Sequence, residues 1–286
     1  MTTMQALTWH VGAFQVTRIR EVEVAGLSFL VPDAIPANLL AIPWLRPRFV
    51  TPDGEAIASI QAFLVETEGR TILIDTAVGV AAQREIPTRI ARTEPFLEEL
   101  AAAGVSPGDI DIVVFTHLHF DHLGWASRDE DGRRTPTFPN ARYLVARTEW
   151  DHWSSQEDAI TRTLLAETLG PVAAAGRLNV VEGDHQIAPG IRLEPTPGHS
   201  PGHVSVHLES EGSRAIVTGD LIHHPAQMAH PGWWTTFDSD VELARRTRLR
   251  FLEREAGSDT LIIGSHFAGS VAGRIERDGP VYRFVD

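Results

Sequence analysis

A dense group of four potential metal ligands follows a short apolar run and constrains this chain more than any other feature. The apolar residues 112–115 and Thr116 lead directly into the motif His117-Leu-His119-Phe-Asp121-His122. Ligands at the end of a buried strand are held on rigid backbone, which suits a cation site. Because alternate side chains of an extended chain share a side, we expect His117 and His119 to converge on one ion. Asp121 and His122 lie past the turn and can face a second ion, and structural histidines explain so dense a cluster poorly.

Three further candidate ligands lie just beyond other apolar runs. His199 stands in a Gly/Pro turn after residues 191–194, Asp220 ends the run 215–220, and His266 follows the run 261–263. Open α/β sheets usually bind ligands beyond the carboxyl ends of their strands, where we expect these side chains. The chain contains no cysteine, which excludes thiolate ligands, disulfides and a cysteine nucleophile. Imidazole and carboxylate without sulfur suit zinc, iron, manganese or cobalt, and zinc is our first expectation.

The secondary-structure signals predict an α/β fold, with two sets of strands and with helices between or after them. Short β-branched runs bounded by turn residues are typical of strands, and they occur at residues 14–22, 62–66, 71–75, 110–115, 178–181, 191–194, 203–208, 215–218 and 261–263. Helices are predicted at 93–104, at 157–169 with Ser155 as a candidate cap, and at 239–254 with a capping-box pattern that begins at Ser239. The last helix carries a basic run, which we interpret as a solvated face rather than a phosphate site: Arg245, Arg246, Arg248 and Arg250.

Two features remain open between a functional and a plain structural interpretation. Residues 30–58 carry several prolines and predict a long irregular excursion, which can be a lid, a pocket wall, an oligomer contact or a simple loop. A set of aromatic residues near the candidate ligands can line an apolar pocket or belong to the core: Trp125, Trp233, Trp234, Phe237 and Phe267.

The order of these candidate ligands resembles the metallo-β-lactamase superfamily. Residues 117–122 match its His-x-His-x-Asp-His motif in full, Asp75 matches its early strand-end Asp, and the later His, Asp and His are matched by His199, Asp220 and His266. The resemblance implies a four-layer αββα sandwich, and we expect one such domain over residues 1–286. It also implies that one ion is bound by His117, His119 and His199 and the other by Asp121, His122 and His266, with Asp220 bridging both. Asp75 would orient ligands through hydrogen bonds, and His203 would either do the same or be structural.

Two such ions predict a hydrolase. Cations about 3.5–4 Å apart share a water and ionise it near neutral pH, and the resulting hydroxide attacks a lactone, an ester or a related small electrophile. Asp121 is placed to pass a proton to the leaving group. The stretch 119–125 resembles the acyl-homoserine lactonase branch, which places a Tyr three residues after the bridging Asp. Here that position is His223, and neither Tyr143 nor Tyr282 matches. We expect His223 to polarise the substrate carbonyl or donate a proton, the alternative being a polar surface residue.

Other chemistries remain possible on the same site. They are phosphotriester or thioester hydrolysis, hydrolytic dehalogenation and, with one iron, a mononuclear dioxygenase; a non-catalytic metal-stabilised protein is a third class. The formal charge of −13 argues against nucleic-acid binding. The sequence shows no apolar run near the roughly 20 residues of a membrane span and no signal-peptide pattern at its start. We therefore expect a cytoplasmic enzyme with a small-molecule substrate, and a homodimer remains open.

Overall fold

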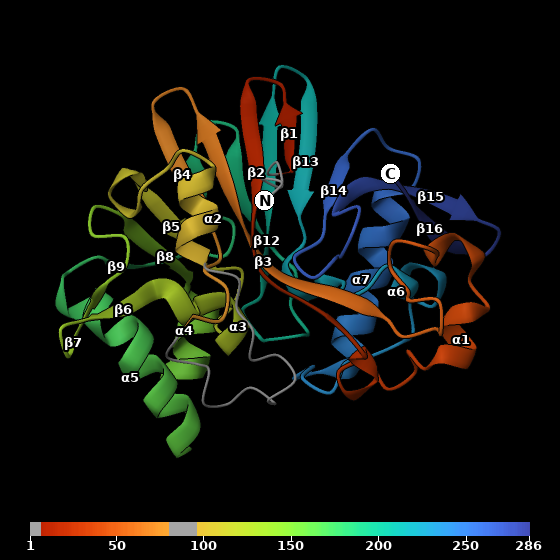
Figure 1. Cartoon of the computed structure of the whole chain (residues 1–286), viewed down its shortest axis with the longest axis horizontal. Coiled ribbons are helices and arrows are strands. Elements are labelled where there is room, and N and C mark those ends of the chain that lie inside the picture. Colours follow the sequence, from red (N-terminus) through yellow and green to blue (C-terminus); the bar gives the residue numbers. More distant parts are fainter. Residues whose placement is uncertain (1–6, 80–95) are drawn as a thin grey trace. The chain divides into compact units, whose positions relative to one another are not determined.

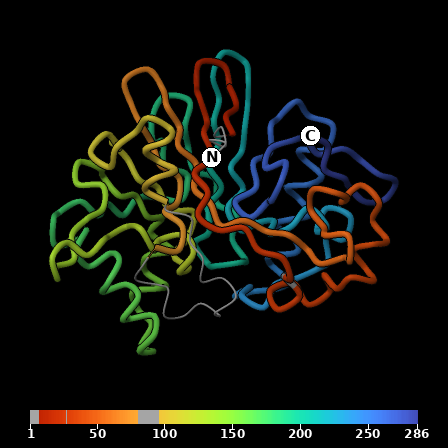
Figure 2. Tube along the Cα trace, viewed as in Figure 1, coloured from red at the N-terminus to blue at the C-terminus, as the bar shows by residue number. Residues whose placement is uncertain are grey.

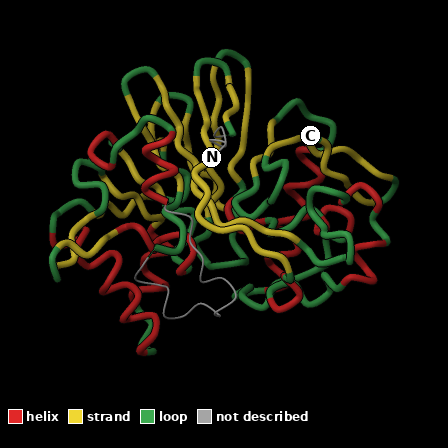
Figure 3. The backbone as a smooth tube through the Cα atoms, in the orientation of Figure 1, coloured by secondary structure: helices red, strands yellow, loops and turns green. Residues whose placement is uncertain are grey.

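The computed structural model describes residues 7–79 and 96–286 and divides the chain into two compact units. The first unit comprises residues 1–22 and 60–182, and the second comprises residues 23–59 and 183–286. Each unit is built around one seven-stranded mixed sheet, drawn as arrows in Figure 1 and in yellow in Figure 3. This mixture of sheets and helices confirms the α/β class predicted from the sequence.

The sheet of the first unit has the strand order β1-β2-β3-β4-β5-β8-β9. Its strands are β1 (Thr8–Val11), β2 (Phe14–Ala25), β3 (Ile57–Thr67), β4 (Arg70–Ile74), β5 (Ile112–Val114), β8 (Arg142–Ala146) and β9 (Leu178–Val181). The pairs from β4 to β9 are parallel, whereas β1 with β2 and β3 with β4 are antiparallel. The apolar residues of β4 and β5 are fully buried, as expected of central parallel strands that are covered on both faces.

The helices of the first unit are α2 (Phe96–Ala102), α3 (Phe120–Leu123), α4 (Arg147–Ser154) and α5 (Ala159–Ala174). Helix α5 packs against the two-stranded hairpin of β6 (Ser127–Glu130) and β7 (Arg133–Pro136). The predicted start of the helix at 93–104 lies outside the described residues. Helix α5 is capped by Asp158, whose Oδ1 accepts from the Thr161 N–H at 2.8 Å, so the prediction of Ser155 as its cap is wrong. The Ser155 hydroxyl instead donates to the His152 carbonyl at the end of α4, at 2.7 Å.

The sheet of the second unit has the strand order β10 to β16, with only β13 and β14 parallel among its described pairs. Its strands are β10 (Gln186–Ala188), β11 (Ile191–Pro195), β12 (Val204–Ser210), β13 (Ser213–Val217), β14 (Leu261–Ile263), β15 (Ala272–Asp278) and β16 (Val281–Val285). Its helices are α1 (Pro36–Leu40), α6 (Ala226–Ala229) and α7 (Val241–Glu255), and α6 packs against β16. The cap of α7 is Asp240, one residue after the predicted Ser239, and its Oδ1 accepts from the Leu243 N–H at 2.9 Å.

The proline-rich segment 30–58 forms part of the core of the second unit. It contains α1 and a short 3₁₀ turn, Pro43–Leu45, and otherwise lacks regular structure until β3 begins. Leu39, Leu45 and Phe49 are buried in one hydrophobic cluster with Phe267 and Phe284. Figure 2 shows this orange segment beside the blue C-terminal strands. Full burial of each such side chain stabilises the fold by about 1.5–3 kcal/mol, a role that the sequence analysis did not foresee.

The structure corrects one more sequence interpretation and decides part of another that was left open. Arg248 of the basic run is only 1% exposed, so the interpretation of that run as a solvated face is wrong for this residue. Phe267 belongs to the core, whereas Phe237 is 47% exposed. Within the part of the chain that the structure describes, no helix is both long and apolar enough to cross a membrane.

Candidate metal centre

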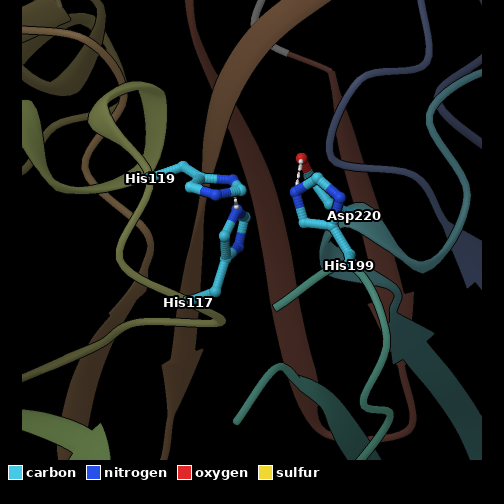
Figure 4. A group of neighbouring side chains, drawn as sticks. All are labelled: His117, His119, His199 and Asp220. Carbon is cyan, nitrogen blue, oxygen red and sulfur yellow. Dashed lines mark hydrogen bonds and ion pairs between the residues drawn. The ribbon is translucent and has the colours of Figure 1, made fainter. Parts of the chain in front are cut away.

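The first unit brings the histidines of the 117–122 motif together at the end of β5. The His117 Nε2 and His119 Nδ1 atoms lie 3.0 Å apart (Figure 4). The ring centroids of His117 and His122 are 4.1 Å apart, and the Asp121 Oδ2 lies 3.8 Å from His122 Nε2. His119 is the extended residue before α3, and α3 carries Asp121 and His122 past the turn, as the motif predicted.

Asp75 orients this cluster from the end of β4. Its Oδ1 accepts from the Thr116 N–H at 2.8 Å, and its Oδ2 accepts from the Thr116 hydroxyl at 2.8 Å. The same Oδ2 lies 2.9 Å from His122 Nδ1. A carboxylate can only accept from that nitrogen, so the ring presents Nε2 as its ligand atom. Asp75 thus makes the hydrogen bond to a candidate ligand that the resemblance implied.

Glu149 of α4 is a supporting residue that sequence reasoning missed. Its buried Oε1 accepts from the Leu118 N–H at 2.9 Å, inside the motif, and from Trp153 Nε1 at 2.6 Å. The Trp153 ring in turn meets the His119 ring edge-on, with centroids 5.2 Å apart. One carboxylate therefore fixes the motif backbone and a neighbour of a candidate ligand. The sequence analysis predicted no helix at residues 147–154, so this role of a single Glu was not foreseen.

Glu21 of β2 holds the loop that follows Asp75. Its Oε2 accepts from the Val78 N–H at 2.6 Å, and its Oε1 accepts from Trp125 Nε1 at 2.7 Å. Burial raises the pKa of this carboxyl, although these hydrogen bonds oppose the shift. Trp125 stacks on Phe96 with centroids 5.9 Å apart, so its ring packs inside the first unit and its N–H is used structurally.

The second unit gathers three histidines around the Asp220 carboxylate, which is buried just after β13. The Asp220 Oδ2 lies 3.2 Å from His199 Nε2 (Figure 4) and 3.0 Å from His223 Nε2. The Asp220 Oδ1 lies 3.0 Å from His266 Nε2. His203 lies behind this group, where its Nε2 accepts from the Asp220 N–H at 2.8 Å. His203 therefore fixes the backbone of Asp220.

The outer nitrogens of two of these histidines are held by acceptors. The His199 Nδ1 lies 3.0 Å from Asp238 Oδ1, and the His266 Nδ1 lies 2.9 Å from the Ser59 carbonyl oxygen. Both nitrogens must therefore donate, and in the neutral rings each Nε2 presents a lone pair to the Asp220 carboxylate. Lone pairs facing a carboxylate repel one another unless a proton or a cation lies between them. A divalent cation fits this donor set.

Protonation is the alternative that the protein itself supplies. Burial lowers the pKa of His199, but its hydrogen bonds to Asp220 and Asp238 outweigh burial and raise the pKa to about 9. The site therefore attracts positive charge at its inner nitrogen. A bound metal ion supplies the same positive charge between the His199 Nε2 and the Asp220 carboxylate, and it replaces this proton.

His223 lies where the lactonase pattern has a Tyr. Its ring is parallel to that of His266, with centroids 5.6 Å apart and planes 10° from each other. The ring is buried, and its Nδ1 has no hydrogen-bond partner among the described residues. Burial lowers the pKa of His223, which favours the neutral ring, and Asp220 partly opposes the shift. The neighbouring His224 is a structural residue, because its Nε2 donates to the Phe49 carbonyl at 2.9 Å.

Each unit thus assembles its own share of the predicted residues. The first unit groups His117, His119, Asp121 and His122, and the second groups His199, Asp220, His223 and His266. Asp238 is the further residue that sequence reasoning missed, since its partner His199 lies 39 positions away. Asp238 precedes the helix predicted at 239–254, and the sequence analysis assigned it no role.

Comparison with known proteins identifies a matching family model and curated relatives that are named as a lactonase and a metallo-hydrolase. A family model described as the metallo-beta-lactamase superfamily matches residues 58–258. An N-acyl homoserine lactonase of Bacillus cereus is 26% identical over 228 residues, which is 75% of this chain and 78% of the relative. A probable metallo-hydrolase of Methanocaldococcus jannaschii is 28% identical over 160 residues, covering 56% of this chain and 69% of the relative.

Solved structures extend the likeness over the whole chain. The hydrolase AbOPH of the beta lactamase superfamily aligns with a TM-score of 0.83 and 24% identity, over 100% of this chain and 98% of its own. AidC, described as a dizinc quorum-quenching lactonase, aligns with a TM-score of 0.82 and 22% identity, over 98% of this chain and 96% of its own. These two likenesses concern the fold.

Proposed function

This chain belongs to the metallo-beta-lactamase superfamily and has its fold, and from that premise we propose that it is a binuclear metallo-hydrolase that opens lactones or small esters. The coarser part of this statement, a metal-dependent hydrolase, follows from the family and the relatives. The finer part concerns two ions, their ligands and the substrate. Its support is the arrangement of nitrogen and carboxylate atoms within each unit and the name of the lactonase relatives.

We propose that the residues of these two groups bind two divalent cations. His117, His119 and His199 would hold one ion, Asp121, His122 and His266 would hold the other, and Asp220 would be a ligand of both. The observation that carries this assignment is that His199 Nε2 and His266 Nε2 lie 3.2 and 3.0 Å from the two oxygens of Asp220, while acceptors hold their Nδ1 atoms. One carboxylate with an imidazole on each oxygen is suited to bridging two ions. Zinc is the preferred metal, as in the dizinc AidC, with iron, manganese and cobalt as alternatives.

When bound, the two cations supply Lewis-acid chemistry, lowering the pKa of a shared water and polarising the substrate carbonyl. The residues of the chain then divide the remaining work. Asp75, Asp238 and the Ser59 carbonyl hold ligand rings by their outer nitrogens. Asp121, whose side chain is 17% exposed, is the more accessible carboxylate and is proposed to carry a proton to the leaving oxygen.

His223 is proposed to act on the substrate carbonyl in the place of the lactonase Tyr. A neutral imidazole can donate a hydrogen bond to a carbonyl oxygen, and burial favours that neutral form. Neither ring nitrogen has a hydrogen-bond partner among the described residues. Because Nε2 lies 3.0 Å from Asp220 Oδ2, Nδ1 is the atom that we propose donates to the substrate. His223→Phe is expected to lower kcat/KM about 100-fold, within the range for loss of one such donor, with metal content unchanged.

Metal content measured together with a substrate panel tests the whole proposal. The panel contains lactones, aryl esters, thioesters and phosphotriesters, assayed with the zinc, manganese, cobalt and iron forms. We expect about two equivalents of metal, with lactones or esters turned over fastest. Asp220→Ala should lose metal and at least about 100-fold of kcat/KM, since loss of outer partners alone costs roughly 10–100-fold. His119→Ala should likewise lose metal and activity together.

Asp259→Ala is the matched control, because Asp259 is an exposed carboxylate of the same unit. It should keep both metal and activity. One equivalent of iron with oxygen uptake would point to a dioxygenase instead. Full activity in a metal-free His119→Ala protein would remove the mechanism.

A further inference from the structure

The basic run of α7 contains one arginine that is buried inside the second unit. Arg248 is 1% exposed, whereas Arg246 and Arg250 on the same helix are exposed. The Arg248 Nε donates to the Leu221 carbonyl at 2.9 Å, and its Nη1 donates to the carbonyls of Pro231, at 3.0 Å, and Trp233. A single guanidinium therefore joins two stretches of backbone.

Both stretches adjoin residues of the proposed metal site that lie in the second unit. Leu221 immediately follows Asp220. Residues 231–238 are here called the aromatic loop, and they end at Asp238. The Asp238 Oδ1 accepts a hydrogen bond from His199 Nδ1 at 3.0 Å, and its Oδ2 accepts one from the Thr235 N–H at 3.0 Å. Arg248 thus connects the backbone at Asp220 with the loop that orients His199.

The aromatic loop is also tied to the segment of His223. The Gln227 Nε2 donates to the Trp233 carbonyl at 3.1 Å, and the Gln227 Oε1 accepts from the His223 N–H at 2.8 Å. The Trp233 carbonyl therefore accepts hydrogen bonds from both Gln227 and Arg248. Through this one oxygen, the guanidinium is linked to the backbone of the proposed carbonyl-binding residue.

Stability alone does not favour a cation in this place. Burial lowers the pKa of Arg248 to about 10, and Asp238 opposes the shift. A buried charge costs several kcal/mol before its interactions offset it, and well-packed apolar side chains often serve a fold equally well. An apolar residue, however, donates no hydrogen bond, and a Lys ammonium lacks the planar fork that reaches carbonyls in different directions.

We propose that Arg248 is a positioning residue that fixes Asp220, His199 and the aromatic loop in the geometry needed to bind metal. The inference rests on the proposed function, in that Asp220 and His199 are taken as ligands. Arg248 touches neither metal nor substrate in this assignment. It acts by holding the backbone from which two ligands and His223 project.

The test compares Arg248→Lys and Arg248→Met with the matched exposed variants Arg250→Lys and Arg250→Met. Zinc affinity is measured by competition with a chromophoric chelator in the absence of substrate. The absorption bands of the cobalt form report ligand geometry, and kcat and KM are measured on the best substrate of the panel. Arg248→Lys should bind zinc about 10–100-fold more weakly, as other losses of outer support do. Its cobalt bands should shift and its kcat should fall with little change in KM, while both Arg250 variants match the parent.

Zinc affinity and cobalt bands in Arg248→Lys equal to those of the parent, with only a lower melting temperature, would overturn the proposal and leave a structural role. Arg248→Lys keeps the charge and most of the volume, so it provides the test even where Arg248→Met fails to fold. A parent that binds two metals but hydrolyses nothing in the panel would remove the proposed function alone. The zinc and cobalt readouts would still decide the role of Arg248. A parent that binds no metal would overturn both.

Discussion

Asp75 has a left-handed backbone conformation, and its carboxylate hydrogen-bonds to residues at the end of β5 and in α3. Its φ of 60° lies in a region that Asp and Asn tolerate better than other residues with a Cβ. Its oxygens accept hydrogen bonds from Thr116 and His122. Asp75→Asn keeps the backbone preference but turns an NH₂ group toward one of these donors. We expect metal affinity to fall about 10–100-fold and unfolding free energy to fall by about 1–3 kcal/mol.

Metal titration followed by urea unfolding checks this prediction. Asp111→Asn is the control, because Asp111 also accepts a backbone N–H, from Thr71 at 2.9 Å, but at an exposed position. That variant should keep its metal affinity. Equal losses of affinity in the two variants would show that Asp75 has no special role in orienting His122.

His224 is expected to make the protein sensitive to mild acid. Its Nε2 donates to the Phe49 carbonyl and its Nδ1 accepts from the Ala226 N–H, so both nitrogens are satisfied only in the neutral ring. Burial lowers its pKa from 6.5 to about 4, although the hydrogen bond to Phe49 opposes the shift. Because the folded pKa is depressed, the stability from this residue is complete above pH 6.5 and is lost as the pH falls from 6.5 to 4.

Urea unfolding at pH 7 and at pH 4 measures this effect. A shift of this size corresponds to about 3 kcal/mol. His224→Gln retains a donor for the Phe49 carbonyl but cannot gain a charge. The difference in unfolding free energy between the parent and His224→Gln should therefore change by about 3 kcal/mol between the two pH values. A constant difference would mean that the ring is protonated at no cost in the folded protein.

Candidate ligands could be recognised from the sequence where several of them lie close together along the chain. Residues whose hydrogen-bond partners are distant in the sequence were missed. The motif at 117–122 is recognisable because its ligands are close together. Asp238 and Glu149 are not, since their partners His199 and Leu118 lie 39 and 31 residues away. Burial of Arg248 was equally invisible, because a run of arginines looks the same whether one of them is enclosed or all are exposed.

At the scale of elements, the start of α7 and the turn that carries His199 constrain each other. Gly198 has a φ of 136°, and a Cβ added there would lie 2.3 Å from the Ala244 backbone nitrogen in the first turns of α7. The Asp240 N–H also donates to the Gly198 carbonyl at 3.0 Å. Gly198→Ala should therefore push the helix away from the turn, at about 1–3 kcal/mol for overpacking in addition to backbone strain of about 1–2 kcal/mol.

Gly212→Ala separates these two contributions. Gly212 also has a positive φ, of 78°, but an added Cβ meets nothing within 4 Å. Denaturant unfolding should show only the strain in this variant, with metal content unchanged. Gly198→Ala should lose more stability and also bind metal more weakly, since it displaces the His199 turn. Equal losses of stability in the two variants would contradict the close packing of the turn against α7.

Elements could be predicted where the side-chain pattern had a single interpretation. The apolar runs that became β4, β5 and β14 have few alternatives, and each strand formed as expected. The hairpin of β6 and β7 was missed because its residues are mostly charged or polar. The caps shifted by one to three residues, since Ser155, Asp158, Ser239 and Asp240 are all good capping residues and only the structure selects among them.

At the scale of the whole molecule, the candidate ligands come from segments that are distant in the sequence. The first unit offers three histidines and Asp121, and the second offers His199, Asp220 and His266. The proposed ions take ligands from segments that only folding brings together, so they bind the folded chain and have little affinity for the unfolded one. Binding of this kind stabilises the fold by mass action.

Removal of metal should therefore lower the stability of the folded chain. At a free metal concentration about 1,000 times the dissociation constant, each ion contributes about 4 kcal/mol to folding. Thermal unfolding of the parent should shift to lower temperature after treatment with a chelator and return when zinc is added back. Asp220→Ala should melt at nearly the same temperature with and without chelator, because it lacks the bridging carboxylate. A parent whose melting temperature is unchanged while its metal is demonstrably removed would show that the ions do not stabilise the fold.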